Sequence, residues 1–220
     1  VLQSLRSGWI TQGPAIPAFE NAVAKKTKAG HAVVVANGTA ALHLAYRAAG
    51  LKADDEIITT ANTFVATSNA ALYLGAKPVF SDIEPEHFNL DPQQIERHVT
   101  KKTKAIAVVH FAGHPADMNA IFVVAKRHGL MVFEDAAHAL GARYHGRPIG
   151  SLASTATMFS FHPVKSITTG EGGLLTTPSK KLAAKMRLLR SHGVTKDDRG
   201  WNVMTELGFN YRITDFQAAL

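Results

Sequence analysis

The sequence predicts an α/β fold in which a mostly parallel sheet is covered by helices on both faces. Short apolar runs alternate with longer amphipathic stretches along the whole chain. These runs are apolar at consecutive positions, which is typical of strands buried on both faces. No internal repeat, low-complexity segment or linker interrupts the alternation. We therefore expect one domain that spans residues 1–220.

Seven apolar runs supply the predicted strands: Ala32–Ala36, the run around Ile57, the run around Val79, Ala105–Phe111, Leu130–Asp135, Thr157–Phe161 and Gly173–Thr177. Helices are predicted between them because capping and terminating residues mark their ends. The predicted helices are Ala15–Ala29, with Pro14 in its first turn and Gly30 after its end, Ala40–Ala49, Gln93–Val99 after Asp91-Pro92, and a helix that Asp117 caps and Gly129 ends.

Both ends of the sequence suggest a fragment. The chain begins with Val1 rather than Met, and it stops one helical turn after a cap at Thr214-Asp215. A helix that has only started cannot bury its apolar face. We therefore expect that both ends are truncated.

Composition excludes several classes of function. The 220 residues contain no cysteine, which excludes a disulfide framework, a thiolate nucleophile and any cysteine-ligated metal centre. No signal-like or membrane-length apolar stretch is present, so we expect a cytoplasmic protein without a membrane partner. The 24 Lys and Arg against 17 Asp and Glu give a net charge of +7. Because these basic residues are dispersed as pairs, we expect no nucleic-acid partner.

Several short catalytic motifs are absent, including GxxxxGKS/T, GxGxxG, HExxH and GxSxG. Three other segments place polar groups directly after predicted strands, where open α/β sheets bind ligands. The first is Asn37-Gly38-Thr39, in front of a predicted helix. Its free N–H groups and the helix dipole would suit a phosphate, and the alternative is a plain N-cap by Thr39.

The second segment is Glu134-Asp135-Ala136-Ala137-His138, at the end of a predicted strand. Asp135 could cap a following helix, ligate a metal or pair with a cationic ring nitrogen. A metal cluster of Asp135, His138, His110 and His114 is conceivable. Eleven histidines make such spacings frequent by chance, so we expect no metal site.

The third segment runs from Phe159 to Gly173 and contains Lys165. This lysine lies between two predicted strands, in a short connection bounded by Pro163 and by glycines. Such confinement would partly desolvate the amine and favour its use in a Schiff base. A solvated loop lysine is the alternative, and the spacing alone does not exclude it.

Seven sequence blocks, taken together and in order, are far more specific than any one motif. They are SGWITQGP, VANGTAALHLA, TTANTFVATSNAALYLGAKPVFSDI, FEDAAHALGARYHGRPIGS, FSFHPVKSITTGEGG, LRSHGV and GFNYRITDFQAAL. They resemble the DegT/DnrJ/StrS family of pyridoxal-phosphate-dependent sugar aminotransferases, which are fold-type I enzymes. FSFHPVK with ITTGEGG is most similar to the UDP-4-amino-4,6-dideoxy-N-acetyl-altrosamine transaminase branch of the pseudaminic-acid pathway, and next to the 4-amino-arabinose branch.

The resemblance implies a large domain of fold type I that binds pyridoxal 5'-phosphate. Lys165 would form a Schiff base with this cofactor and then act as acid and base, and Asp135 would pair with the pyridine nitrogen. The remaining candidates would contact the cofactor: Gly38, Thr39 and Ser160 at the phosphate, Phe64 on the ring face, His138 near the phenolic oxygen, and Asn210 at the phosphate of a neighbouring subunit. A shared site of this kind implies a homodimer.

The implied reaction transfers an amino group, with glutamate as donor, to the 4-keto carbon of a nucleotide-linked 6-deoxy sugar. Family members carry Trp or Tyr in place of Phe64 and Gln in place of His138, and they continue into a smaller C-terminal domain that is missing here. One alternative is a pyridoxal-dependent sugar dehydratase, although such relatives have histidine in place of Lys165. Another is a truncated relative without catalysis.

Overall fold

The structure, a computed structural model that describes residues 1–220, contains one large sheet. Its seven strands lie in the order β1-β9-β8-β5-β4-β2-β3, and β9 alone runs antiparallel to its neighbours. The strands are β1 (His31–Val35), β2 (Glu56–Thr60), β3 (Lys77–Ser81), β4 (Thr103–Val109), β5 (Met131–Asp135), β8 (Ala156–Ser160) and β9 (Gly173–Thr177). The seven-stranded, mostly parallel sheet expected from the sequence is confirmed.

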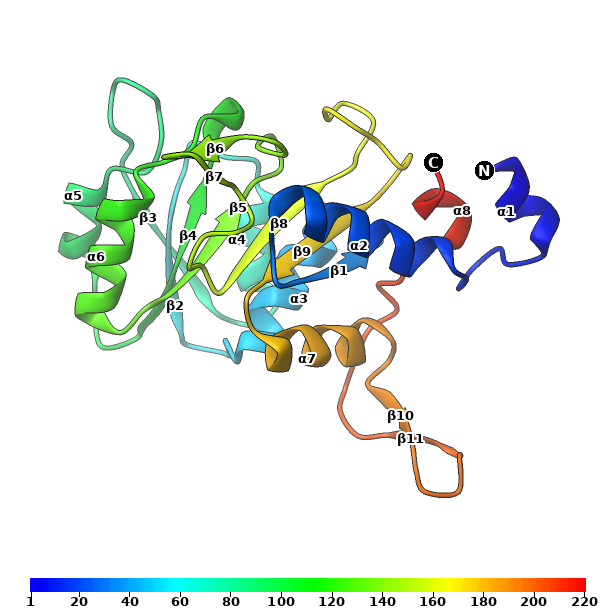
Figure 1. Ribbon diagram of the computed structural model, residues 1–220. Helices are drawn as coiled ribbons and strands as arrows, with labels where there is room; N and C mark the ends of the chain where they lie inside the picture. The colour runs from blue at the N-terminus through cyan, green and yellow to red at the C-terminus, as the bar shows by residue number, and fades with distance from the viewer.

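Helices cover both faces of this sheet (Figure 1). The two layers are α2 (Ala15–Thr27) and α6 (Met118–His128) on one face, and α3 (Gly38–Ala49), α4 (Ala66–Leu72) and α7 (Lys180–Arg190) on the other. Alternate residues of each strand face opposite layers, so Val34 packs in the first core and Val33 in the second. Both valines are fully buried, and such burial contributes about 1.5–3 kcal/mol for each side chain.

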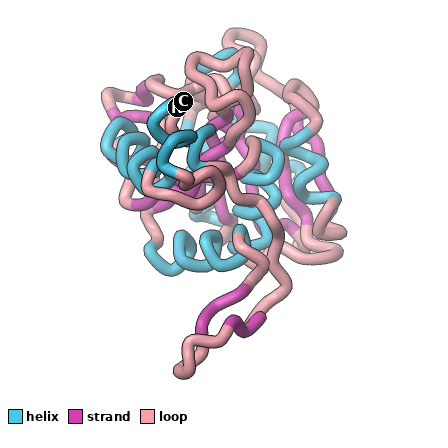
Figure 2. The backbone as a smooth tube through the Cα atoms, turned by 90° about the vertical axis from the view of Figure 1, so that its right-hand side faces the viewer, coloured by secondary structure: helices cyan, strands magenta, loops and turns pink.

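Several small elements were not expected from the sequence. They are α1 (Leu2–Ser7), the 3-10 helix η2 (Phe111–Gly113), and the hairpins β6–β7 (Arg143–Tyr144, Arg147–Pro148) and β10–β11 (Val194–Lys196, Asn202–Met204). The helical turn expected after Thr214-Asp215 is α8 (Asp215–Ala218), and the region of the predicted helix Gln93–Val99 contains α5 (Pro92–Ile95) and the 3-10 helix η1 (Glu96–His98). The β10–β11 hairpin projects from the body, and the two termini lie side by side (Figures 1 and 2). None of the helices combines the length and apolar character needed to cross a bilayer.

Three predicted helix boundaries were wrong. Helix α2 ends at Thr27 because Lys28, rather than Gly30, adopts the left-handed conformation, with φ 56°, and its N–H closes the last turn. The predicted helix Gln93–Val99 is a single α turn followed by a 3-10 turn. Helix α3 begins at Gly38 instead of Ala40, since Asn37 is its N-cap.

Candidate active site

A cavity of about 1000 Å³ opens at the edge of the sheet where β1, β5 and β8 end. This is the edge at which parallel strands and the following loops present ligand-binding groups. All eight candidate residues named from the sequence line it: Gly38, Thr39, Phe64, Asp135, His138, Ser160, Lys165 and Asn210. Residues separated by more than 170 positions in the chain therefore meet in one site.

The N-terminus of α3 forms one wall of the cavity. The side chain of Asn37 accepts a 2.8 Å hydrogen bond from the N–H of Ala40, so the expected alternative of an N-cap by Thr39 is wrong. The N–H groups of Gly38 and Thr39 lie in the first turn, where no intrahelical acceptor exists. The positive end of the helix dipole points the same way. This wall is suited to an anion.

The carboxylate of Asp135 lies on the floor of the cavity and is almost entirely buried. Its Oδ2 accepts a 2.6 Å hydrogen bond from the hydroxyl of Thr67, and its Oδ1 accepts one of 3.2 Å from the N–H of Ala137. Burial raises the pKa of Asp135, and these two hydrogen bonds oppose that rise. No helix follows β5, so the expectation that Asp135 could cap one is wrong.

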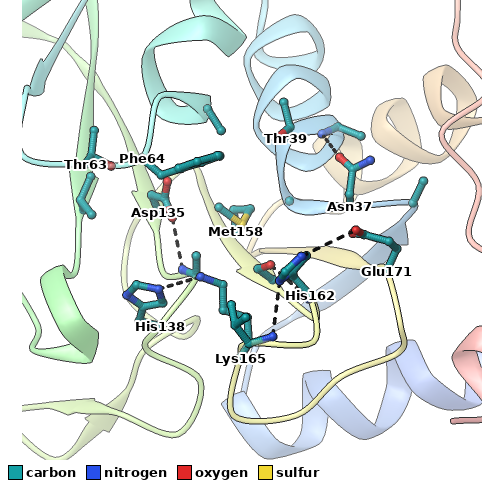
Figure 3. Close-up of a pocket in the computed structure, with 18 of the residues that line it drawn as sticks. Asn37, Thr39, Thr63, Phe64, Asp135, His138, Met158, His162, Lys165 and Glu171 are labelled. Carbon is teal, nitrogen blue, oxygen red and sulfur yellow. Dashed lines mark hydrogen bonds and ion pairs between the residues drawn. The ribbon is translucent and has the colours of Figure 1, made fainter.

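Lys165 extends from the loop between β8 and β9 toward His138 (Figure 3). The Lys165 Nζ donates to His138 Nε2 at 2.6 Å. Partial burial, and then the positive charge of Lys165, lower the pKa of His138, while Asp135 raises it. The imidazole is therefore a neutral acceptor for the lysine amine near neutral pH.

The histidines of the conceivable metal cluster have other partners. His110 Nε2 lies 2.8 Å from Glu134 Oε2 in the core, and His110 Nδ1 accepts from the N–H of Ala116, so the ring proton lies on Nε2. Burial raises the pKa of Glu134, but the hydrogen bonds and charge of His110 bring it below its ordinary value. His114 stacks on His87. No group of three or more such side chains could hold a metal ion.

The mouth of the cavity is lined by exposed groups. Phe64 is 76% exposed and Val164 is 77% exposed, and His162 lies 3.9 Å from Glu171 across the opening (Figure 3). Asn210 lies at the rim of the same chain's cavity. Its predicted contact with a neighbouring subunit stays a prediction.

Sequence reasoning missed Thr67 and Thr63, whose hydroxyls lie 3.0 Å apart, and the Thr67 hydroxyl donates to Asp135. Thr63 lies before the start of α4, so no helical spacing in the sequence pairs it with Thr67. It also missed Tyr211, which lines the cavity and whose hydroxyl lies 2.9 Å from His43. No pattern in the sequence pairs these two residues, which are far apart in the chain.

The donor set fits a phosphorylated pyridine aldehyde. Its phosphate needs free N–H groups, which the N-terminus of α3 presents. Its ring nitrogen needs a carboxylate and its carbonyl needs an amine, which are present in Asp135 and Lys165. A Cβ at Gly38 would lie 3.3 Å from Met158 Sδ, a tight contact, so glycine at this position keeps the space between α3 and β8 open. The fold is that of the fold-type I pyridoxal-phosphate enzymes.

Comparison with known proteins gives the family. The model of the DegT/DnrJ/EryC1/StrS aminotransferase family matches residues 1–220, and the chain belongs to this family of pyridoxal-phosphate enzymes. The resemblance seen in the sequence blocks is thus confirmed.

Three relatives illustrate the similarity. GDP-perosamine synthase of Caulobacter vibrioides is 48% identical over 221 residues, which are 100% of this chain and 59% of that protein. Helicobacter pylori PseC, an aminotransferase involved in pseudoaminic acid biosynthesis, has a TM-score of 0.95 and 37% identity over 99% of this chain and 59% of its own. NtdA of Bacillus subtilis, solved with bound PMP, has a TM-score of 0.91 and 33% identity over 99% of this chain and 49% of its own. The chain thus spans about 59% of the length of the curated relatives it matches.

Proposed function

We propose that the protein is a pyridoxal-phosphate-dependent aminotransferase that aminates the 4-keto carbon of a nucleotide-linked 6-deoxy sugar. The observation that carries the proposal is the convergence of Lys165, Asp135 and the N-terminus of α3 on one cavity. Such a set combines an amine, a buried carboxylate and an anion site, which transamination requires together. A dehydratase is disfavoured because its relatives have histidine in place of Lys165.

The cofactor, when bound, supplies an electron sink for the electron pair of a breaking C–H bond. Lys165 would hold the cofactor covalently through Nζ. Once the amino donor has displaced it, the free Nζ would act as acid and base by accepting and returning a proton. His138 accepts a hydrogen bond from Nζ and so orients the amine. Asp135 would keep the ring nitrogen protonated, which stabilises negative charge in the ring.

The phosphate would be held by the N–H groups of Gly38 and Thr39 and by the hydroxyl of Ser160, all of which line one wall. Phe64 would cover one face of the ring. A helix terminus supplies only about half a charge against a phosphate dianion, so further donors are needed. Asn210 of a second subunit is the donor we propose, which makes the functional unit a homodimer.

A nucleotide-linked 4-keto sugar is proposed as the substrate because the names of relatives concern amino sugars. GDP-perosamine synthase is one such relative, and PseC takes part in pseudoaminic acid biosynthesis. We propose the UDP-linked N-acetylhexosamine from the FSFHPVK and ITTGEGG blocks, with glutamate as donor and a cytoplasmic setting that suits a chain without cysteine.

Borohydride reduction of the cofactor-loaded protein followed by peptide mapping tests the proposal. We expect the adduct on Lys165, and we expect Lys165→Ala to lose it while Lys104→Ala, at an exposed lysine of β4, keeps it. Incubation with UDP-linked and GDP-linked 4-keto-6-deoxy sugars and glutamate then identifies the product by mass. An adduct on another lysine would refute the mechanism.

A further inference from the structure

The hydroxyl of Thr67 forms hydrogen bonds with side chains of the site rather than with the backbone of its own helix. Thr67 is fully buried at the start of α4, and the residue before that helix provides no side-chain cap. The contacts of the Thr67 hydroxyl are Asp135 Oδ2 at 2.6 Å and Thr63 Oγ1 at 3.0 Å. A threonine at the start of a helix usually hydrogen-bonds to the backbone. Because the Thr67 hydroxyl bonds to two side chains instead, we infer that it has a role at the site.

The proton order in this chain of hydroxyls follows from the acceptor. An ionised carboxylate only accepts, so Thr67 donates its single proton to Asp135. Thr67 must then accept from Thr63, whose hydroxyl therefore donates. The backbone of Thr67 is also held, because its carbonyl accepts from the buried hydroxyl of Tyr46 at 3.3 Å.

Few other contacts stabilise the ionised form of Asp135. No cationic side chain forms a hydrogen bond or salt bridge with it, and the nearby His110 and His138 lower its pKa less than its two hydrogen bonds do. Burial raises the pKa of Asp135, and the bond from Thr67 opposes this more than that from Ala137. A carboxyl that lost its charge could still accept a hydrogen bond from a protonated ring nitrogen, but it would no longer balance the positive charge on that nitrogen.

We propose that Thr67 is a positioning residue that keeps Asp135 ionised and orients its carboxylate toward the ring nitrogen of the cofactor, with Thr63 supporting it from the cavity wall. The inference rests on the proposed function, because it assigns Thr67 a role toward the same cofactor. A structural role alone predicts loss of stability on substitution without a change in the titration of Asp135.

The first test is the titration of Asp135 by carbon NMR in the full chain without cofactor, with Asp135→Asn assigning the resonance. Thr67→Val should raise the pKa of Asp135 by about one unit or more, as loss of a hydrogen bond to a charged group implies. Thr67→Ser should retain the wild-type value. Thr59→Val is the matched control, because it removes another fully buried hydroxyl, which donates to a backbone carbonyl.

A second variant covers the case in which Thr67→Val does not fold. Thr63 is only half-buried, and Thr63→Val should raise the pKa of Asp135 in the same direction by less. An Asp135 titration that is unchanged in both valine variants, or in the one that folds, would overturn the inference.

The last measurement is the dissociation constant of pyridoxal phosphate by equilibrium dialysis. Thr67→Val should bind about tenfold more weakly, and Thr67→Ser and Thr59→Val should bind like the wild type. Wild-type affinity in Thr67→Val would overturn the inference while leaving the proposed function in place. Absence of a Lys165 adduct in the wild-type protein would instead refute the proposed function. The NMR titration needs no cofactor, so its outcome is independent of that result.

Discussion

The hydrogen bond between Lys165 and His138 is the residue-level contact on which the proposed chemistry most depends. His138 Nε2 can accept from Lys165 Nζ only while the imidazole is neutral. Burial and the charge of Lys165 lower the pKa of His138 against the opposing charge of Asp135. The acceptor is therefore available above the ordinary histidine value of 6.5 and is lost as the pH falls through the lowered pKa.

Replacing His138 should consequently change the pH dependence of cofactor attachment. In the wild type, we expect the rate of adduct formation at Lys165 to fall on the acid side as His138 becomes protonated. His138→Gln keeps an acceptor that does not titrate, so this acid limb should disappear. Stopped-flow absorbance across the pH range measures both rates.

The matched control is His162→Gln, which removes the other histidine near Lys165. His162 faces Glu171 instead of the lysine amine, so its substitution should keep the acid limb. The same acid limb in wild type and His138→Gln would contradict the assigned role of His138.

Close packing of two elements, β9 and the turn between β1 and α3, sets the position of the anion site. A Cβ at Gly173 would lie 2.3 Å from the carbonyl oxygen of Asn37 and 2.8 Å from the nitrogen of Gly38. Only glycine permits this approach, because such distances are far below van der Waals contact. The first strand residue of β9 therefore positions the N-terminus of α3.

Gly173→Ala should displace the start of α3 and weaken binding of pyridoxal phosphate. Overpacking of this kind costs about 1–3 kcal/mol, which we expect as a lower midpoint in urea unfolding. Gly30→Ala is the control near the other end of the β1–β9 pair. A Cβ there would meet its nearest atoms at 3.5 Å, which is ordinary contact, so stability and affinity should hold. Equal effects of both substitutions would rule out this explanation.

The whole molecule presents a cavity mouth bordered by exposed apolar side chains. Phe64, Val164 and Tyr73 are each more than half exposed, and Asn210 lies near them at the rim. Burial of such a surface between two copies would complete both sites with one contact, since a two-fold interface uses the same patch twice. This arrangement is the physical basis of the proposed homodimer.

Sedimentation with and without pyridoxal phosphate tests the homodimer. We expect a dimer, and we expect Asn210→Ala to weaken cofactor binding about tenfold through loss of a bond to a charged group. Asn119→Ala, at an exposed asparagine on α6, is the control and should change neither property. A monomer with normal affinity, or a dimer in which Asn210→Ala binds normally, would refute the shared site and leave the chemistry of Lys165 unaffected.

Local patterns alone predicted the seven sheet strands, the covered faces of the sheet and the polar segments at strand ends. These features depend on residues close in sequence: consecutive apolar positions mark doubly buried strands, and glycine or asparagine marks turns. Because parallel strands end at one edge, Asn37, Asp135 and Lys165 could be expected to meet. The ordered sequence blocks then identified the family.

Tertiary structure decided what local patterns could not. Thr67 meets Asp135 across 68 residues, and β9 meets Asn37 only because glycine allows its approach. The start of α3 at Gly38 depended on which of two capping side chains reached the backbone, and Asn37 did so. Contacts between distant segments have no sequence period of their own, since they form only when the sheet and both helical layers have packed.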